Sequence, residues 1–348
     1  MEIQLYHWAT TTGMPAGQAT FRSQLSDFFV SESLRFEPSG EGAHHLLLIE
    51  KNNINTDVVC HKLRRFAEVK PTDIGYAGKK DRFAVARQWF SVQLPLLRDI
   101  DWQQLNDEEI KVLQTSRHDK KLRIGAVKEN HFKIILREFQ GDRALLLEKI
   151  EQIKSQGFAN YFGSQRFGRQ GSNLERGLDL LATNKRIKNR NLQGLLFSAV
   201  RSFLFNHLLS ERIKKGWFTS LLEGDYVQLD GSESGFLVEN LSQEMIRFEE
   251  NDIHPTALLA GRGREQVAHV SLQFEQDTLV EYQHIVEQLE RRGLHADRRA
   301  IRVFPKNVMI DWHNDETLAL SFSLPKGAFA TSFLRELVTL KQIESYDD

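Results

Sequence analysis

A block of helical periodicity interrupts a sequence whose two ends both have the features of β-strands. Between about residues 156 and 305, apolar residues recur at helical spacing, most clearly in NLQGLLFSAVRSFLFNHLLSERIKK, which begins at Asn191. Before and after this block lie alternating or short apolar runs such as HLLLIEK and TLALSFSLPKG. A period that changes and then returns predicts one domain inserted into another.

The flanking segments predict a sheet with helices packed on it. ATFRSQLSDFFVSESL is typical of two strands joined by a turn at Ser26-Asp27, and WFSVQL and HFKIILREF are further strand candidates. A helix capped by Asn55 or Thr56 is expected to run to Phe66. Helices are also expected over RALLLEKIEQIKSQ, LVEYQHIVEQLERRGL and ATSFLRELVTLK. We therefore expect an α+β fold.

Composition and missing motifs exclude several classes of protein. The 348 residues are 41% hydrophobic, with one cysteine, so a sizeable core is expected and a disulfide framework or cysteine-rich zinc site is excluded. No run approaches the roughly 18 apolar residues of a membrane span, and no secretory signal is visible, so we expect a cytoplasmic protein. GYAGKK lacks phosphate-loop spacing, and HExxH and GxSxG are absent. We expect neither a metal nor a cofactor.

Positive charge is concentrated in five clusters although the net charge is only −1. A phosphate backbone is bound by repeated cations along one surface, so the clusters favour a nucleic-acid partner, and a folded RNA would fit a cleft lined with them. Each cluster alone is most often a solvated face. The clusters are 117–123, 184–190, 211–215, 261–264 and 291–302.

The stretch GYAGKKDRFAVARQWFSV, which begins at Gly75, places a carboxylate among cations on a loop before a strand. Asp81 is anionic at neutral pH by its ordinary pKa, and an ionised, positioned carboxylate is a legitimate covalent nucleophile. Gly75 and Gly78 let a backbone approach a substrate closely. From the residues alone, a surface turn with a salt bridge is the favoured interpretation of the pattern.

Five segments resemble, in the same order, motifs of the TruD family of tRNA pseudouridine synthases. The stretch around Asp81 is similar to the family pattern GxxKDxxAxTxQxxS. The others are FRSQLSDFFVSE, RHDKKLRIGAVKENHFKIILR, NYFGSQRFG and LPKGAFATSFLREL, so the resemblance runs from about residue 20 to 340. It implies a pseudouridine-synthase-like mixed, mostly antiparallel sheet flanked by helices, with an inserted α/β domain. Residues 1–155 and 306–348 would be catalytic, and 156–305 the inserted TRUD domain that grips tRNA.

The resemblance also implies roles for individual residues. Asp81 matches the catalytic aspartate, and Phe132 matches the aromatic residue that stacks on the target base. The remaining matches would bind or position the substrate, and the basic residue at position 22 would keep Asp81 ionised and oriented. Two positions depart from the pattern: Glu129 replaces a usual glycine and Ala86 a usual threonine. The implied substrate-binding residues are Arg22, Phe28, Lys80, Asn130 and Phe329, in addition to Phe132.

The implied activity is isomerisation of uridine 13 in the D arm of tRNA to pseudouridine, without cofactor or metal. Asp81 would attack the ribose anomeric carbon, attack C6 of the base, or remove the 2′ proton, and the sequence leaves these three open. A non-catalytic tRNA-binding protein or RNA chaperone on the same fold is the main alternative. A metal-dependent nuclease using Asp81 and Lys80 is a weaker one, because no second carboxylate stands at a suitable spacing nearby. We expect a monomer.

Overall fold

The computed structural model of the chain describes residues 7–183, 185 and 187–342. It divides into two compact units, each described by itself. The sheet unit comprises the described parts of Ala16–Leu146, Pro305–Gly327 and Val338–Asp348. The helical unit comprises the described parts of Met1–Pro15, Leu147–Phe304 and Ala328–Leu337. The predicted division into a catalytic and a tRNA-gripping domain follows other boundaries and stays a prediction.

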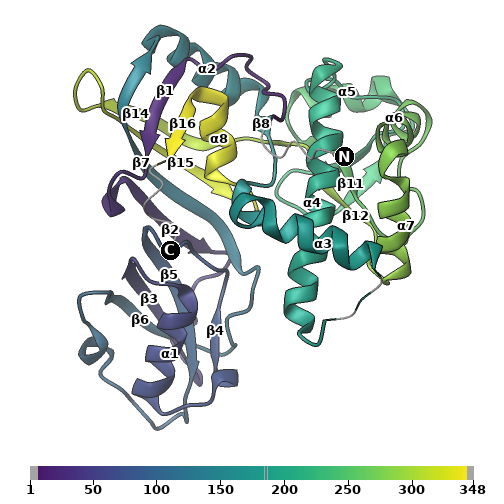
Figure 1. Cartoon of the computed structure of the whole chain (residues 1–348). Helices are drawn as coiled ribbons and strands as arrows, with labels where there is room; N and C mark the ends of the chain where they lie inside the picture. The colour runs from purple at the N-terminus through teal and green to yellow at the C-terminus, as the bar shows by residue number, and fades with distance from the viewer. Residues whose placement is uncertain (1–6, 184, 186, 343–348) are drawn as a thin grey trace. The chain divides into compact units, whose positions relative to one another are not determined.

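The sheet unit is built on a single mixed, mostly antiparallel sheet, as expected (Figure 1). Parallel pairing joins β2 to β5 and β1 to β16, and the other pairs are antiparallel. β1 (Gly17–Phe21) pairs with β7 and β16 (Thr339–Gln342), and β4 (Ile74–Tyr76) pairs with β5. The main path runs through β14 (Lys306–Trp312), β15 (Leu318–Pro325), β7 (Val127–Gly141), β2 (Phe28–Leu34), β5 (Val85–Gln93), β3 (His44–Asn52) and β6 (Ile110–His118).

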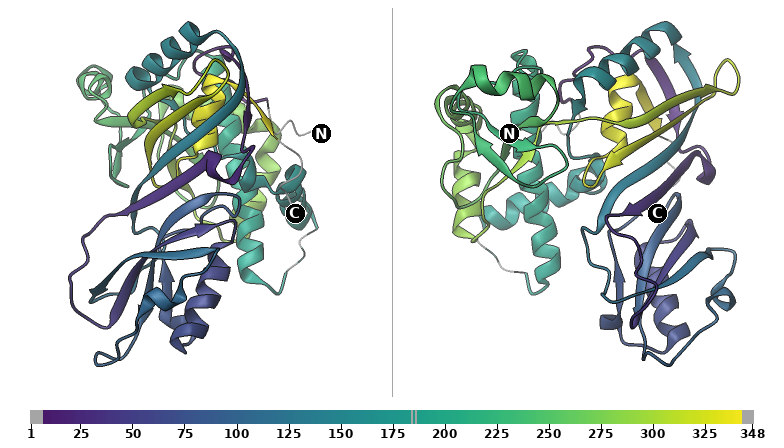
Figure 2. Two further views of the ribbon diagram at one scale, coloured as in Figure 1. Left: turned by 90° about the vertical axis from the view of Figure 1, so that its left-hand side faces the viewer. Right: turned by 180° about the vertical axis from the view of Figure 1, so that it is seen from behind.

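Helix α1 (Thr56–Ala67) covers one face of this sheet beside β3 and β6 (Figures 1 and 2). It begins after Asn55, whose backbone is extended, and ends at Glu68, whose φ of 53° is left-handed. Val59 and Leu63 lie four residues apart, as one face of a helix requires, and both are fully buried in one cluster with strand residues. The helix is therefore packed onto the sheet through one apolar face.

One row of paired residues crosses five strands. The register pairs Lys51 of β3 with Ala86 of β5, Ala86 with Val30 of β2, Val30 with Phe132 of β7, and Phe132 with Phe322 of β15. Because directly paired residues point to the same side of a sheet, their side chains share one face. This row places Lys51 and Phe132, which are distant in sequence, on the same face of the sheet.

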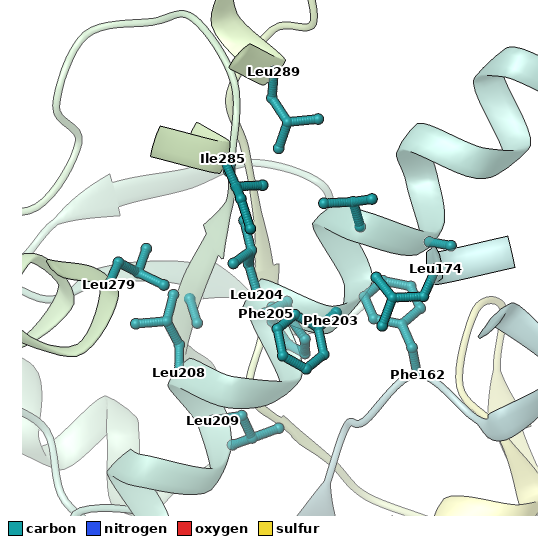
Figure 3. Packing of buried hydrophobic residues seen from close by; sticks show 14 of the residues in the cluster. Phe162, Leu174, Phe203, Leu204, Phe205, Leu208, Leu209, Leu279, Ile285 and Leu289 are labelled. Atoms are coloured by element: carbon teal, nitrogen blue, oxygen red, sulfur yellow. The ribbon is translucent and has the colours of Figure 1, made fainter. Parts of the chain in front are cut away.

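The helical unit packs its helices around α4 (Arg190–Lys214) and a four-stranded sheet of order β10-β9-β11-β12. Figure 3 shows Phe203, Leu204 and Leu208 of α4 among the packed apolar side chains. α3 (Ser172–Ala182) and α8 (Ala330–Leu337) belong to the same unit. The other elements are α5 (Leu241–Glu249), α6 (His269–Leu279), α7 (Gln283–Arg291), β8 (Phe158–Ala159), β9 (Tyr226–Leu229), β10 (Gly235–Leu237), β11 (Ile253–Leu259), β12 (Asp297–Ala300) and β13 (Arg302–Val303).

Two predicted helices were wrong in extent. The helix expected over 279–294 is divided, because α6 ends at Leu279 and α7 begins at Gln283, with a 3₁₀ turn between them whose Tyr282 packs on Phe203. The helix expected over 330–341 ends at Leu337, because 339–342 pair with β1 instead. The helix expected over 143–156 is confirmed as α2 (Arg143–Gln156).

Within the residues that the structure describes, every helix is too short or too polar to cross a membrane.

Candidate active site

Asp81 lies on the segment between β4 and β5, and a buried lysine binds its main chain. Lys51 Nζ donates to the carbonyl oxygen of Asp81 at 2.6 Å and to that of Ile54 at 2.8 Å. The lysine side chain is fully buried. Burial lowers the pKa of Lys51 to about 8; the charge of Asp81 opposes this shift and that of Lys80 adds to it. A buried lysine thus holds the Asp81 segment from inside the protein.

Three further hydrogen bonds hold the glycine-containing loop before Asp81. Gln88 of β5, fully buried, donates from Nε2 to the carbonyl oxygen of Gly78. Thr56 Oγ1 donates to Gln88 Oε1 at 3.1 Å and accepts from the Lys80 amide, also at 3.1 Å. The start of α1 and the middle of β5 therefore fix the loop, whose glycines alone would leave it free to move.

Lys80 forms an internal ion pair with Glu32 of β2. Lys80 Nζ lies 2.5 Å from Glu32 Oε2, and the glutamate side chain is fully buried. Glu32 Oε1 accepts from the Trp89 amide at 2.7 Å. Burial raises the pKa of Glu32, and Lys80 works against that shift. Lys80 is therefore paired within the protein, and its predicted contact with substrate stays a prediction.

Arg22 meets the side chain of Asp81, as expected. An Arg22 Nη2 hydrogen bonds to Asp81 Oδ2, and the two side chains are 22% and 33% exposed. The carboxylate is thus oriented by a cation yet open to a ligand. Arg22 has a left-handed φ of 61°, uncommon for a residue other than glycine, and its guanidinium lies 4.3 Å from the centre of the Phe28 ring. Such conformations often occur at functional sites.

Three stacked phenylalanines continue the site along the sheet. The Phe132 ring lies 6.1 Å from Phe28 and 5.3 Å from Phe322, at interplanar angles of 21° and 26°. Phe28 is only 5% exposed, whereas Phe132 is partly exposed. Phe132 can therefore offer the open part of its ring to a ligand, supported by Phe28 and Phe322. The role predicted for each stays a prediction.

Asn130 stands on the same face of β7 as Phe132, opposite Glu32 of β2. Its Oδ1 is buried and lacks a hydrogen-bond partner within the described part of the chain. A buried acceptor without a donor costs free energy, so a ligand with an N–H or O–H group would be stabilised there. This geometry is compatible with the predicted substrate contact.

Phe329 belongs to the helical unit, where its ring lies 6.1 Å from that of Phe162. Its predicted place at the uridine pocket stays a prediction.

The two departures from the family pattern fit their surroundings. Glu129 has no left-handed φ, so glycine is not required there, and its carboxylate lies 3.6 Å from the His131 ring. Ala86 is fully buried in the row of paired residues, between Lys51 and Val30.

Sequence reasoning missed the residues that support the site. Lys51 ends the apolar run HLLLIEK and looks like a solvated charge at a strand end, and Glu32 ends DFFVSE in the same way. Thr56 was expected only as a possible cap and Gln88 was given no role. The only available signal was that Glu32 and Gln88 lie inside the family motifs.

The five basic clusters are not uniformly exposed. Arg212 and Arg302 are 3% and 4% exposed. Arg212 pairs with Asp225 at 2.6 Å, and Arg298 pairs with Glu275. Arg212, Arg298 and Arg302 therefore form contacts inside the protein. The expectation that these three arginines face RNA is wrong. In the cluster 184–190, residues 184 and 186 lie outside the described residues.

Known proteins resemble this chain over nearly its whole length. A family model described as "tRNA pseudouridine synthase D (TruD)" matches residues 2–187 and 184–337. The chain is 40% identical to tRNA pseudouridine synthase D of Proteus mirabilis over 341 residues, with 97% of each chain covered. It is 42% identical to that of Methylococcus capsulatus over 327 residues, with 92% of each covered.

A solved structure shares the fold. The putative tRNA pseudouridine synthase D of Methanosarcina mazei matches with a TM-score of 0.72 and 21% identity, covering 95% of each chain. The family model covers most of the chain in two parts, and the two relatives are 40% and 42% identical to it. The chain belongs to the tRNA pseudouridine synthase D family.

Proposed function

We propose that this protein isomerises uridine to pseudouridine in tRNA, at uridine 13 of the D arm, with Asp81 as the nucleophile. Membership of the family supports the reaction and the substrate class. The observation that carries the proposal is the setting of Asp81: its main chain is held by buried Lys51, and its partly exposed carboxylate is paired with Arg22. The position in tRNA rests on the resemblance alone.

The reaction breaks the bond between ribose C1′ and uracil N1 and forms a bond from C1′ to C5. N1 gains a proton and C5 releases one, so the product is an isomer and no oxidant or reductant is needed. Asp81 would supply its electron pair to the substrate and recover it when the new bond forms. Arg22 would keep the Asp81 carboxylate anionic and oriented, since an opposite charge nearby favours the ionised form.

Phe132 would hold the everted uracil. A base must leave its stack to be reached, which costs a few kcal/mol, and stacking on an aromatic ring returns about 1–3 kcal/mol. The exposed side of Phe132 and the buried acceptor of Asn130 lie on one face of the sheet, which suits a flat base with N–H donors. Phe28 would support the Phe132 ring from behind.

Release of tritium from tRNA labelled at C5 of uridine tests the reaction. The protein should release label in proportion to pseudouridine formed, and mapping should place the product at uridine 13. Tight tRNA binding with no release would instead identify a non-catalytic binder on the same fold. Strand cleavage that depends on magnesium would identify a nuclease.

The proposal carries two secondary expectations. The protein would act in the cytoplasm, where its tRNA substrate is, and it would act as a monomer. Light scattering of the free protein and of its 1:1 mixture with tRNA would check the second expectation, with a dimer mass contradicting it.

A further inference from the structure

Two arginines of the helical unit share one aromatic ring, Phe162, which follows β8. The Cζ atom of Arg299, on β12, lies 4.2 Å from the ring centre. That of Arg166, on the 3₁₀ turn Ser164–Phe167, lies 5.3 Å from it. Two guanidinium groups are thus gathered at the same ring although they are more than a hundred residues apart in sequence.

Hydrogen bonds hold both Arg299 and the main chain of Phe162 in place. Arg299 donates to Asn160 twice, from Nη2 to Oδ1 at 2.5 Å and from Nε to the carbonyl oxygen at 3.2 Å. Asn160 Nδ2 donates in turn to the carbonyl oxygen of Ala300 at 2.8 Å. The main chain of Phe162 is bound at both its N–H and its C=O by the buried side chain of Asn206, at 2.9 and 3.0 Å. The ring and the Arg299 guanidinium are therefore held in place.

Arg166 differs from Arg212 and Arg298, two buried arginines of the helical unit. Arg212 and Arg298 each pair with a carboxylate, Asp225 and Glu275. Arg166 forms no recorded ion pair with a described residue, and its Nε is buried without a hydrogen-bond partner there. The side chain nevertheless keeps part of its surface open. A buried N–H donor that lacks a partner would be stabilised by a hydrogen-bond acceptor from a ligand.

The electrostatics of the two arginines point the same way. Burial lowers the pKa of Arg166. Burial, with a further contribution from Arg166, lowers the pKa of Arg299 to about 9. The charge of Arg166 thus disfavours the charged form of Arg299, so holding the two arginines together has an electrostatic cost. An anion bound at Arg166 would reduce that repulsion.

We propose that Arg166 and Arg299, at the ring of Phe162, bind a phosphodiester group of the RNA substrate. A phosphodiester has two free oxygens and one negative charge, and arginine forks recognise such groups with paired N–H donors. Phe329, packed on the same ring, is the residue predicted to line the uridine pocket. The bound phosphate would belong to the tRNA substrate, and this assignment rests on the proposed function.

The test measures tRNA affinity of the full-length Arg166→Gln protein across salt concentrations. Loss of a charge-assisted hydrogen bond worth about 1.5–3 kcal/mol should weaken binding roughly 10- to 100-fold. The slope of log affinity against log salt should fall by roughly 0.7–0.9 for the one phosphate lost. Arg247→Gln is the control, because Glu244 and Asp252 already neutralise that arginine at 3.1 and 2.7 Å. Its affinity should change less than twofold.

A second arm identifies the phosphate without relying on the variant. A set of D-arm RNAs, each with one neutral methylphosphonate, should contain a position that weakens wild-type binding about tenfold and has little effect on Arg166→Gln. Arg166→Lys should recover part of the lost affinity. Unchanged affinity and slope in Arg166→Gln, an equal loss in Arg247→Gln, or the absence of any sensitive position with wild-type protein would each overturn the subsite.

The two proposals fail separately. If wild-type protein releases no tritium but the salt and methylphosphonate results are as expected, the phosphate subsite stands and the reaction does not. If tritium is released and the binding results are negative, the reaction stands without the subsite.

Discussion

The segment around Asp81 and the segment around Arg166 differ in whether their charged side chains have partners within the protein. Near Asp81, three cations have partners within the chain: Arg22 binds the carboxylate, Lys80 pairs with Glu32, and Lys51 binds two carbonyl oxygens. Arg166 shares a ring with a second arginine and has a buried donor atom with no partner in the described part of the chain.

This difference separates two tasks. A nucleophile must keep its position and its ionised form before substrate arrives, and internal partners supply both. A binding group that is already neutralised within the protein gains little from an external anion, whereas an unneutralised one gains more. We therefore propose that the Asp81 segment carries the chemistry and that the Arg166 segment binds phosphate. The following predictions test that assignment, from the largest free-energy change to the smallest.

Glu32→Gln should destabilise the sheet unit most. It removes the charge partner of Lys80 inside the protein, and breaking a buried pair in this way costs about 3–5 kcal/mol. Urea unfolding would measure the loss. Glu50→Gln is the control, since its partner Arg87 is largely exposed and such a pair is worth about 1 kcal/mol or less. Equal effects of the two substitutions would show that the Lys80 pair is not special.

Lys51→Met should lower the rate at saturating tRNA by about 100-fold. The carbonyl oxygens of Asp81 and Ile54 lose their donor, and a shift of about 1 Å in a reacting group has an effect of this size. Single-turnover kinetics would measure it, with Lys62→Met as the control, since Lys62 is a partly exposed lysine paired with Asp107. An unchanged rate with lower stability would mean that Lys51 is only a structural residue. tRNA affinity should remain near normal.

Phe132→Ala should lower kcat/KM by roughly 10- to 100-fold, because stacking on a base is worth about 1–3 kcal/mol. Phe132→Tyr keeps the ring and should retain most activity. Steady-state kinetics on tRNA would distinguish them. If both variants unfold at lower urea but turn over normally, Phe132 belongs to the core alone.

The smallest effect should be a decline in rate as pH rises through about 8. Lys51 loses its charge there, and the groups that face it are Asp81 and Lys80, the latter paired with Glu32. Its folded pKa lies below the ordinary 10.5, so between these two values the unfolded chain binds more protons and this group makes folding more favourable as pH rises. The rate should therefore fall without loss of stability. A rate that falls only together with the melting temperature would contradict this.

The sequence predicted local features better than distant contacts. The strand at His44–Asn52 and the helix at Thr56–Ala67 follow from periodicity and a cap signal. The end of α8 at Leu337 could not be foreseen, because 339–342 gain hydrogen bonds from β1, more than three hundred residues earlier. A local pattern carries no information about such a partner.

The same limit applies to the site. Asp81, Arg22 and Phe132 were found through motif resemblance, and the structure brings Arg22 to Asp81. The buried positions of Lys51 and Glu32 depend on how β2, β3 and the Asp81 segment meet, so their charges look ordinary in sequence. For the same reason Arg212 looks like part of an exposed basic cluster, although its partner Asp225 buries it.

The most direct test of the account is the single-turnover rate of Asp81→Asn at saturating tRNA, measured by tritium release alongside tRNA affinity. The substitution keeps the size of the side chain and removes its negative charge. We predict that pseudouridine formation is abolished while the dissociation constant for tRNA stays within about threefold of wild type, a change of less than 1 kcal/mol. Near-normal turnover would contradict the assignment of Asp81 as the nucleophile.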